Sequence, residues 1–278
     1  MTCDTNPTDR LLETAHLPLR GNRLAGYSAI VSGAGSAGDL VGVGSAIAIL
    51  FAAQGASVTL LDCDQARAEN TLHGIRAIGG QGLVVKGDVT QAEGCTSAVA
   101  RACAAFGRVD ILINNAAIAR LGDIKAISIE DIDATIALNL RAPLLLAKAT
   151  AAALIQSKGS MINIASVAGF RGCGMPAYAA TKAALSGLTR DLAFSLGPGG
   201  VRVNCIVPGP IHTPMANTGA DARNRRRRLN MLGIEGTAWD IAFAALFLSS
   251  REARWITGAN LFVDAGYSIA GAPPVHPD

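Results

Sequence analysis

Residues 28–44 read SAIVSGAGSAGDLVGVG, a short apolar run that leads into a turn containing five glycines. The apolar segment 45–54 follows, so the pattern predicts a strand, a glycine-rich turn and a helix. Glycines let backbone N–H groups approach a bound anion, and the N-terminus of a helix adds a positive dipole. This stretch therefore predicts a phosphate-binding loop of the kind that holds dinucleotides.

Strands and helices alternate along the rest of the chain. The apolar runs predict strands at residues 28–32, 57–61, 82–86, 109–113, 160–164, 201–206 and 260–263. Helices are predicted between them at 45–54, 66–78, 92–106, 129–155, 177–196 and 239–248. Continuously apolar strands separated by helices are typical of a parallel sheet that is covered on both faces. We predict a single doubly wound α/β domain of Rossmann type with a seven-stranded parallel sheet.

This domain is expected to span residues 23–270, between a polar N-terminal arm (1–22) and a proline-rich C-terminal tail (271–278). The N-terminus lacks the basic start and apolar stretch of a signal peptide, and the apolar run 41–53 is too short to span a bilayer. We therefore expect a cytoplasmic protein without membrane contact.

Composition argues against several classes of partner. The net charge of +3 is too small to imply a nucleic acid. The six cysteines form no CxxC pair, so we expect reduced thiols rather than disulfides. The four histidines lie far apart in the sequence, and no metal site is predicted.

The glycine-rich turn allows two positions for the start of the helix. A literal GxGxxG lies at Gly33, Gly35 and Gly38, but it leaves Gly42 and Gly44 inside the helix, where each costs about 1 kcal/mol relative to alanine. We prefer a helix that starts after residues 42–44, with residues 37–41 as an extra excursion. An ordinary strand–helix turn without a ligand is the alternative.

Asp62 ends the second predicted strand, about twenty residues after the glycine-rich turn. A carboxylate at this point accepts hydrogen bonds from an adenosine ribose and repels a 2′-phosphate, so it favours NAD over NADP. Cys63 follows it, so no adjacent cation offsets this repulsion. The alternative is an aspartate in a surface turn.

Tyr178 and Lys182 stand four residues apart near the start of a predicted helix. At this spacing the two side chains share one face, with about 5–6 Å between their Cβ atoms. A nearby ammonium stabilises a phenolate and lowers the tyrosine pKa, which makes Tyr178 able to exchange a proton with an alcohol. Such a pair by itself is also common on solvated helix faces.

Other motifs follow the predicted strands in a characteristic order. They are SGAGS…GVG at 32–44, Asp62, Gly87-Asp88-Val89, Asn114-Asn115-Ala116, Asn139 in ALNLRAP, Ser166 in NIASVAG, the Tyr178/Lys182 pair and PGPIHTP at 208–214. With these motifs at these separations, the chain resembles the short-chain dehydrogenase/reductase family over about residues 22–270. The resemblance implies an NAD-dependent oxidoreductase that acts on a CH–OH group.

The resemblance also implies roles for individual residues. It implies that Ser166 orients the substrate oxygen, Tyr178 transfers the proton, Lys182 lowers the tyrosine pKa and holds the nicotinamide ribose, and Asn139 holds a water of a proton relay. The cofactor-binding residues that it implies are Gly33, Ser36, Gly42, Val43, Asp62, Asp88, Val89, Asn115, Ala116, Tyr178, Lys182, Ile211 and Thr213. It further implies a homotetramer built through helices 129–155 and 177–196 and the C-terminal strand region.

A basic run, Arg223 and Arg225–Arg228, lies in the segment that is typically a lid over the substrate in this family. Three interpretations stay open: a solvated lid helix or oligomer surface, a clamp for an anionic substrate, and a nucleic-acid patch. The residues expected to face the substrate are 117–121, 168–176 and 211–220, which are mostly small and apolar, with Arg120 and Arg171 as polar handles.

The leading hypothesis is an NAD(H)-dependent enzyme that interconverts a secondary alcohol and a ketone. A reductase of 3-oxoacyl thioesters and a catalytically idle NAD(H)-binding regulator are the alternatives. The idle regulator is disfavoured by the combination of Asn139, Ser166, Tyr178 and Lys182. A protein that only binds NAD(H) has little use for the serine and the asparagine.

Overall fold

The computed structural model describes residues 19–269 except 37–39, 121 and 217–218. Its centre is a seven-stranded sheet in which all neighbours are parallel, in the order β3-β2-β1-β4-β5-β6-β7. The strands are β1 Ser28–Ser32, β2 Ser57–Asp62, β3 Gln81–Lys86, β4 Ile111–Asn114, β5 Ser160–Ile164, β6 Arg202–Pro208 and β7 Asn260–Val263. The predicted doubly wound parallel sheet is confirmed.

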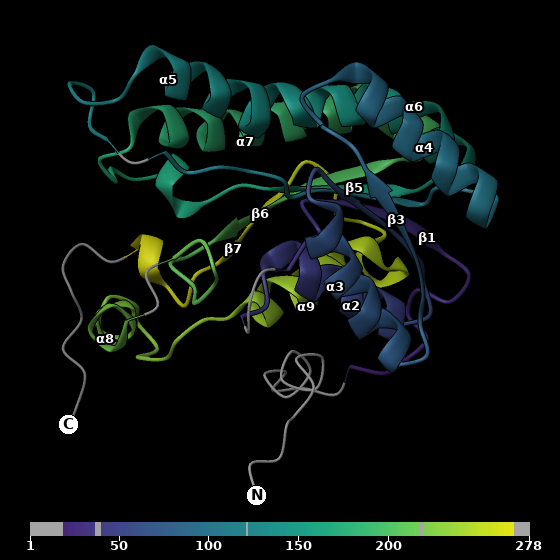
Figure 1. The fold of residues 1–278 in the computed structure, drawn as a ribbon, viewed down its shortest axis with the longest axis horizontal. Coiled ribbons are helices and arrows are strands. Elements are labelled where there is room, and N and C mark those ends of the chain that lie inside the picture. Colours follow the sequence, from purple (N-terminus) through teal and green to yellow (C-terminus); the bar gives the residue numbers. More distant parts are fainter. Residues whose placement is uncertain (1–18, 37–39, 121, 217–218, 270–278) are drawn as a thin grey trace, which may run out of the picture.

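Helices cover both faces of this sheet (Figure 1). One face carries α2 (Val43–Ala53), α3 (Gln65–Ala77) and α9 (Ala238–Ser249). The other face carries α4 (Ala92–Phe106), α6 (Ala142–Ser157) and α7 (Pro176–Leu196), with α5 (Ile129–Ile136) leading into α6. The short helix α8 (Ala220–Arg228) lies apart from both layers, beyond the β7 edge.

The two faces form separate apolar cores because side chains alternate along each strand. In β1, Ala29 and Val31 pack toward α2 and α9, whereas Ile30 packs toward α4. In β4, Ile113 belongs to the first core and Leu112 to the second. Both sides of the sheet are therefore buried, which explains why the strand sequences are continuously apolar.

Two elements differ from the predicted ones in a way that affects the site. Helix α2 begins at Val43, two residues earlier than predicted, with Gly42 as its N-cap. The predicted helix 129–155 is not one regular α-helix, because a π-helical turn, η1 (Ala137–Arg141), separates α5 from α6. By length and composition this helical stretch, Ile129–Ser157, could cross a membrane, but here Leu146 and Leu154 are buried in a core of the sheet.

The predicted arm and tail lie largely outside the described residues, since residues 1–18 and 270–278 are not described. Residues 19–22 of the arm are bonded to the end of α2. The side chain of Gln54 donates to the Leu19 carbonyl (2.7 Å), and Gly21 N–H donates to the Ala53 carbonyl (3.0 Å). This part of the arm is attached to the folded domain.

Candidate active site

A cleft of about 1050 Å³ runs along the carboxyl edge of the sheet, where the chain order reverses between β1 and β4. Doubly wound sheets bind ligands at this point because adjacent crossovers leave the strand ends uncovered. Thirteen of the predicted catalytic and cofactor-binding residues line it: Gly33, Gly42, Val43, Asp62, Asp88, Val89, Asn115, Ala116, Ser166, Tyr178, Lys182, Ile211 and Thr213.

Close backbone contacts shape the glycine-rich turn. Gly33 has a φ of +62°, which favours glycine, and its N–H donates to the Leu61 carbonyl (2.9 Å). A Cβ on Gly44 would collide with the Gly33 carbonyl oxygen. Gly42 caps α2 without a side-chain hydrogen bond, and Gly42, Val43 and Gly44 all line the cleft. The first amides of α2 therefore fit a pyrophosphate.

Ser36, in contrast, does not reach the cleft. Its side chain is buried, and its N–H donates to the Arg67 carbonyl (3.0 Å), so the chain turns it toward α3. Ser36 is not among the residues that line the cleft in the described chain, and its contact with the cofactor stays a prediction. The adjacent acidic Asp39, part of the predicted excursion, lies outside the described residues.

Asn115 ties the two strand ends together at the switch point. Its side-chain Nδ2 donates to the carbonyls of Ser32 (3.0 Å) and Gly33 (2.9 Å). Its backbone N–H donates to the hydroxyl of Ser32 (3.0 Å), which in turn donates to the Ile113 carbonyl (3.1 Å). These bonds hold the floor of the cleft in place.

The Asp62 carboxylate is fixed at the far end of the cleft. Its Oδ2 accepts from Gly35 N–H (2.8 Å) and its Oδ1 from Asp64 N–H (3.0 Å). The inference that no cation lies nearby is wrong, because Arg67 lines the same end of the cleft and its Cβ packs close to Gly35. Its guanidinium pairs with Asp64 (3.1 Å) rather than with Asp62. Arg67 is not adjacent to Asp62 in the sequence, but the first turn of α3 brings it back to the same end of the cleft.

Tyr178, Lys182 and Ser166 meet at the opposite end. Helix α7 places Lys182 Nζ 5.8 Å from the centre of the Tyr178 ring. Lys182 is buried, and its Nζ donates to the Ile164 carbonyl at the end of β5 (2.8 Å). Ser166, two residues further on, caps the turn η2 (Val167–Gly169) and lies close enough to the Tyr178 side chain to lower its pKa. The predicted triad is therefore brought together.

Burial governs the proton affinities of this group. It lowers the pKa of Lys182 from 10.5 to about 8, because a charged ammonium is poorly solvated there. Burial also raises the pKa of Tyr178, although the Ser166 hydroxyl lowers it and Cys173 adds to the rise. The sequence predicts a lowered tyrosine pKa. In the structure burial outweighs the contributions that lower the Tyr178 pKa, and Lys182 Nζ donates to the Ile164 carbonyl.

Asn139 lies in the π-helical turn and does not line the cleft. Its side chain accepts from Ile118 N–H (2.9 Å) and donates to the Ile118 carbonyl (2.8 Å) and to the Thr181 hydroxyl (3.3 Å). The wider turn thus aims one asparagine at both the loop after β4 and the first turns of α7. Single π-turns occur frequently at functional sites.

The basic run belongs to α8, and two of its arginines are engaged in ion pairs. Arg223 and Arg226 bind the two oxygens of the buried Glu235 carboxylate (2.7 and 3.1 Å), and Arg226 Nη2 also lies 3.2 Å from His212 Nδ1. Arg225, Arg227 and Arg228 are exposed, and no arginine of α8 lines the cleft. The structure therefore does not bring this run to the cleft as a clamp.

Several cleft residues escaped sequence analysis. Cys63, Arg67 and Thr90 line the end near Asp62, and Tyr267 lines the other end. Arg67 could have been predicted to line the cleft, because it lies five residues after Asp62 in the first turn of the following helix. Tyr267 follows the last strand in a 3₁₀ turn and carried no such signal. Of the residues expected to face the substrate, Leu121 and 217–218 are outside the described chain.

Comparison with known proteins agrees with this geometry. A family model described as enoyl-(acyl carrier protein) reductase matches residues 37–268. The chain is 40% identical over 251 residues to 2,5-dichloro-2,5-cyclohexadiene-1,4-diol dehydrogenase LinX of Sphingobium indicum, covering 89% of this chain and 98% of that protein. It is 35% identical to trans-4-hydroxycyclohexanecarboxylate dehydrogenase of Sinomonas cyclohexanicum, covering 88% and 94%.

Among solved structures, a short-chain dehydrogenase of Burkholderia cenocepacia in complex with NADP superposes with a TM-score of 0.82. It is 37% identical, and the match covers 90% of this chain and all of that one. The chain belongs to the short-chain dehydrogenase/reductase family. This family binds a nicotinamide cofactor. Among residues 19–269 as described, no three metal-ligating side chains form a group.

Proposed function

We propose that this short-chain dehydrogenase/reductase is an NAD(H)-dependent enzyme that oxidises a secondary alcohol to a ketone and catalyses the reverse reduction. Asn139, Ser166, Tyr178 and Lys182 are the proposed catalytic residues. The observation that carries the proposal is that Ser166, Tyr178 and the buried Lys182 line one cleft, with Lys182 Nζ 5.8 Å from the centre of the Tyr178 ring.

Bound NAD⁺ would supply the hydride acceptor. The chain's own residues handle the oxygen and its proton: Ser166 and Tyr178 hold the substrate hydroxyl between them, and the Tyr178 phenolate accepts its proton while the carbonyl forms. Because burial raises the pKa of Tyr178 here, the Lys182 ammonium is needed to make the phenolate accessible near neutral pH. In the reduction, the same tyrosine returns the proton to the forming alkoxide.

NAD is the proposed cofactor because of Asp62. Two backbone amides hold its carboxylate in the cleft, so a 2′-phosphate would meet a fixed negative charge. Arg67 lines the same cleft and would weaken this discrimination by its positive charge, and the similar Burkholderia cenocepacia protein is in complex with NADP. We therefore propose a preference for NAD that Asp62 sets and that Arg67 moderates.

A cyclic secondary alcohol is the proposed class of substrate. The relatives named above are dehydrogenases of a cyclohexadienediol and of a hydroxycyclohexanecarboxylate. The substrate end of the cleft is walled by small and apolar residues, among them Ala117, Ile118, Met175 and Met215, which suit a compact ring. Among the described residues, we find no feature of the cleft that specifically favours the alternative substrate, a 3-oxoacyl thioester on a carrier.

Tyr178→Phe tests the proposal. Removal of the hydroxyl should reduce NAD-linked oxidation of cyclohexanol-type alcohols by about 100- to 10,000-fold, the usual contribution of a proton-transfer group, while NADH binding is retained. Tyr27→Phe is the matched control, because Tyr27 precedes β1 at the opposite edge of the sheet. Turnover that survives in Tyr178→Phe contradicts the mechanism. A wild type that binds NADH but turns over no alcohol or ketone would support an idle regulator instead.

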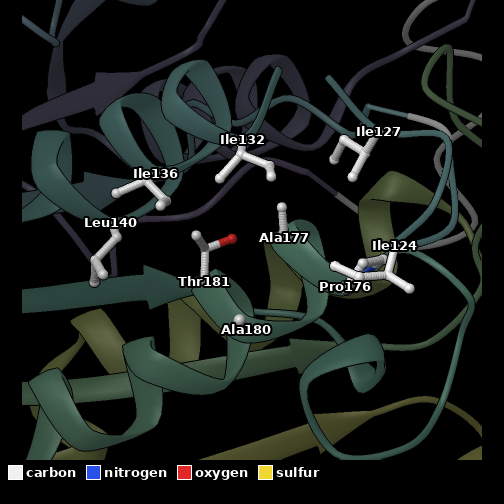
Figure 2. A pocket seen from close by; sticks show the side chains of 9 residues that line it. All are labelled: Ile124, Ile127, Ile132, Ile136, Leu140, Pro176, Ala177, Ala180 and Thr181. Atoms are coloured by element: carbon white, nitrogen blue, oxygen red, sulfur yellow. The ribbon is translucent and has the colours of Figure 1, made fainter. Parts of the chain in front are cut away.

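We also propose the homotetramer and the cytoplasmic location expected from the sequence. A groove of about 340 Å³ supports the assembly: Figure 2 shows isoleucines of the α5 region facing Ala177 and Thr181 of α7 across it. Ile124 lines the groove and is 71% exposed, and Ile129 at the start of α5 is 69% exposed, so large apolar side chains are uncovered in the single chain. Light scattering of the purified protein should give four chains, and a monomer would contradict this.

A further inference from the structure

The cleft contains three arginines, and they differ in their partners. Arg67 pairs with Asp64 (3.1 Å), and Arg120 pairs with Asp131 (3.2 Å). Arg171 makes no ion pair with any carboxylate among the described residues. Since a guanidinium is charged at every physiological pH, the exposed Arg171 presents to the cleft a positive charge that pairs with no described carboxylate.

Arg171 is nevertheless held in place. Its Nη1 donates to the Tyr267 carbonyl (2.8 Å), and its guanidinium lies over the Tyr267 ring, 4.4 Å from the centre. The preceding Phe170 packs edge-on against Phe262 of β7, with ring centres 4.9 Å apart. These contacts anchor the loop before α7 on the C-terminal strand, so the remaining guanidinium donors are positioned before a ligand arrives.

The position of Arg171 relates it to the substrate rather than to the cofactor phosphates. It lies between Ser166 and Tyr178 in sequence and lines the same cleft. The acidic residues that line the cleft, Asp62 and Asp88, are at the adenosine end.

We propose that Arg171 is a specificity-determining residue that binds a carboxylate on the substrate, at a carbon other than the one oxidised. This deepens the proposed function and rests on it: the preferred substrate is then a cyclic hydroxy acid rather than a neutral alcohol. A planar guanidinium pairs with a carboxylate through two parallel hydrogen bonds. The exposed arginines of α8 do not line the cleft and take no part.

The kinetic test compares an acid with its neutral counterpart, 4-hydroxycyclohexanecarboxylate and 4-hydroxycyclohexanecarboxamide, in NAD-linked oxidation. Arg171→Gln should raise KM for the acid about 10- to 100-fold, the loss expected for a charge-assisted hydrogen bond, and leave kcat and the KM of the amide nearly unchanged. Arg171→Lys should recover part of the loss. Arg227→Gln, the same change on an exposed residue of α8, should have no effect.

A binding measurement separates this inference from the proposed function. Cyclohexanecarboxylate, which has no hydroxyl to oxidise, is titrated calorimetrically into the wild-type enzyme with NADH, and cyclohexanecarboxamide serves as the neutral probe. Tighter binding of the acid that is lost in Arg171→Gln supports the anion site even if no alcohol is turned over. Equal binding of the two probes, or an equal effect of Arg171→Gln on both, overturns it. Unchanged NADH affinity in the variant verifies that the cleft is intact.

Discussion

Arg226 Nη2 lies 3.2 Å from His212 Nδ1 and 3.1 Å from Glu235 Oε1, so one guanidinium nitrogen joins helix α8 to the loop after β6. Arginine can only donate hydrogen bonds, and therefore His212 Nδ1 accepts and the imidazole is neutral, with its proton on Nε2. The neighbours of His212 in the chain, Ile211 and Thr213, both line the cleft. The attachment of α8 is thus linked directly to the cleft.

This contact predicts a pH-dependent attachment of α8. Burial lowers the pKa of His212 below 6.5, Arg223 and Arg226 lower it further, and Glu235 opposes them. The folded form therefore binds the proton less well than the open form, so the stabilisation is complete above pH 6.5 and is lost as the pH falls below that value. Burial raises the pKa of Glu235, but its arginines lower it overall, so this carboxylate stays ionised throughout this window.

Hydrogen–deuterium exchange of residues 220–228, corrected for intrinsic rates, measures this opening at pH 7.5 and pH 5.5. We expect α8 to open more at the lower pH in the wild type. His212→Asn should remove most of this dependence, because the asparagine carbonyl accepts from Arg226 at either pH. His73→Asn, at an exposed position of α3, is the control. The same pH response in His212→Asn and the wild type would refute the role of the imidazole.

The cofactor preference should respond in opposite directions to two substitutions at one end of the cleft. Asp62→Asn should decrease the ratio of kcat/KM for NAD to that for NADP by about 10- to 100-fold, since it removes a charged acceptor and a repulsive charge. Arg67→Gln should decrease the residual activity with NADP and leave that with NAD nearly unchanged. Steady-state kinetics with both cofactors measures both effects.

Glu69→Gln is the control for this pair, because Glu69 is an exposed residue of the same helix and does not line the cleft. A wild type that turns over faster with NADP would show that Arg67 and not Asp62 dominates. An unchanged ratio in Asp62→Asn would exclude the carboxylate from cofactor selection.

Features that depend on local periodicity were predictable from the sequence. The apolar runs located all seven strands, and the spacing of four residues placed Tyr178 and Lys182 on one face of α7. Strand ends in a parallel sheet meet at one edge, which is why Asp62 and Ser166 could be assigned to the same cleft. These inferences needed only the period of the helix and the direction of the strands.

Features that depend on side-chain partners were not predictable. The π-helical turn that aims Asn139 at Ile118 leaves the apolar pattern of residues 129–157 unchanged. The sequence of the basic run does not indicate that Arg226 is buried against Glu235 while Arg227 is exposed. Partners twelve or more residues apart in the chain, such as Arg223 and Glu235, are chosen by packing, which a one-dimensional pattern does not contain.

The glycine-rich turn leads to a prediction about stability and cofactor binding together. Alanine is the better helix former by about 1 kcal/mol, so helix propensity alone favours Gly44→Ala. Here the new Cβ would collide with the Gly33 carbonyl and lie 2.5 Å from Asn115 Nδ2, and both atoms belong to the floor of the cleft. We expect Gly44→Ala to lower the free energy of unfolding by about 1–3 kcal/mol, the usual range for overpacking, and to weaken NADH binding.

Gly197→Ala is the matched control. Gly197 has helical dihedral angles (φ −56°, ψ −41°), and a Cβ there meets no heavy atom within 4 Å. Urea unfolding followed by circular dichroism should therefore show Gly197→Ala equal to or slightly more stable than the wild type, and NADH fluorescence titration should show unchanged affinity. If Gly44→Ala behaved like this control in both measurements, the close approach of α2 to the end of β1 would not be what shapes the phosphate-binding turn.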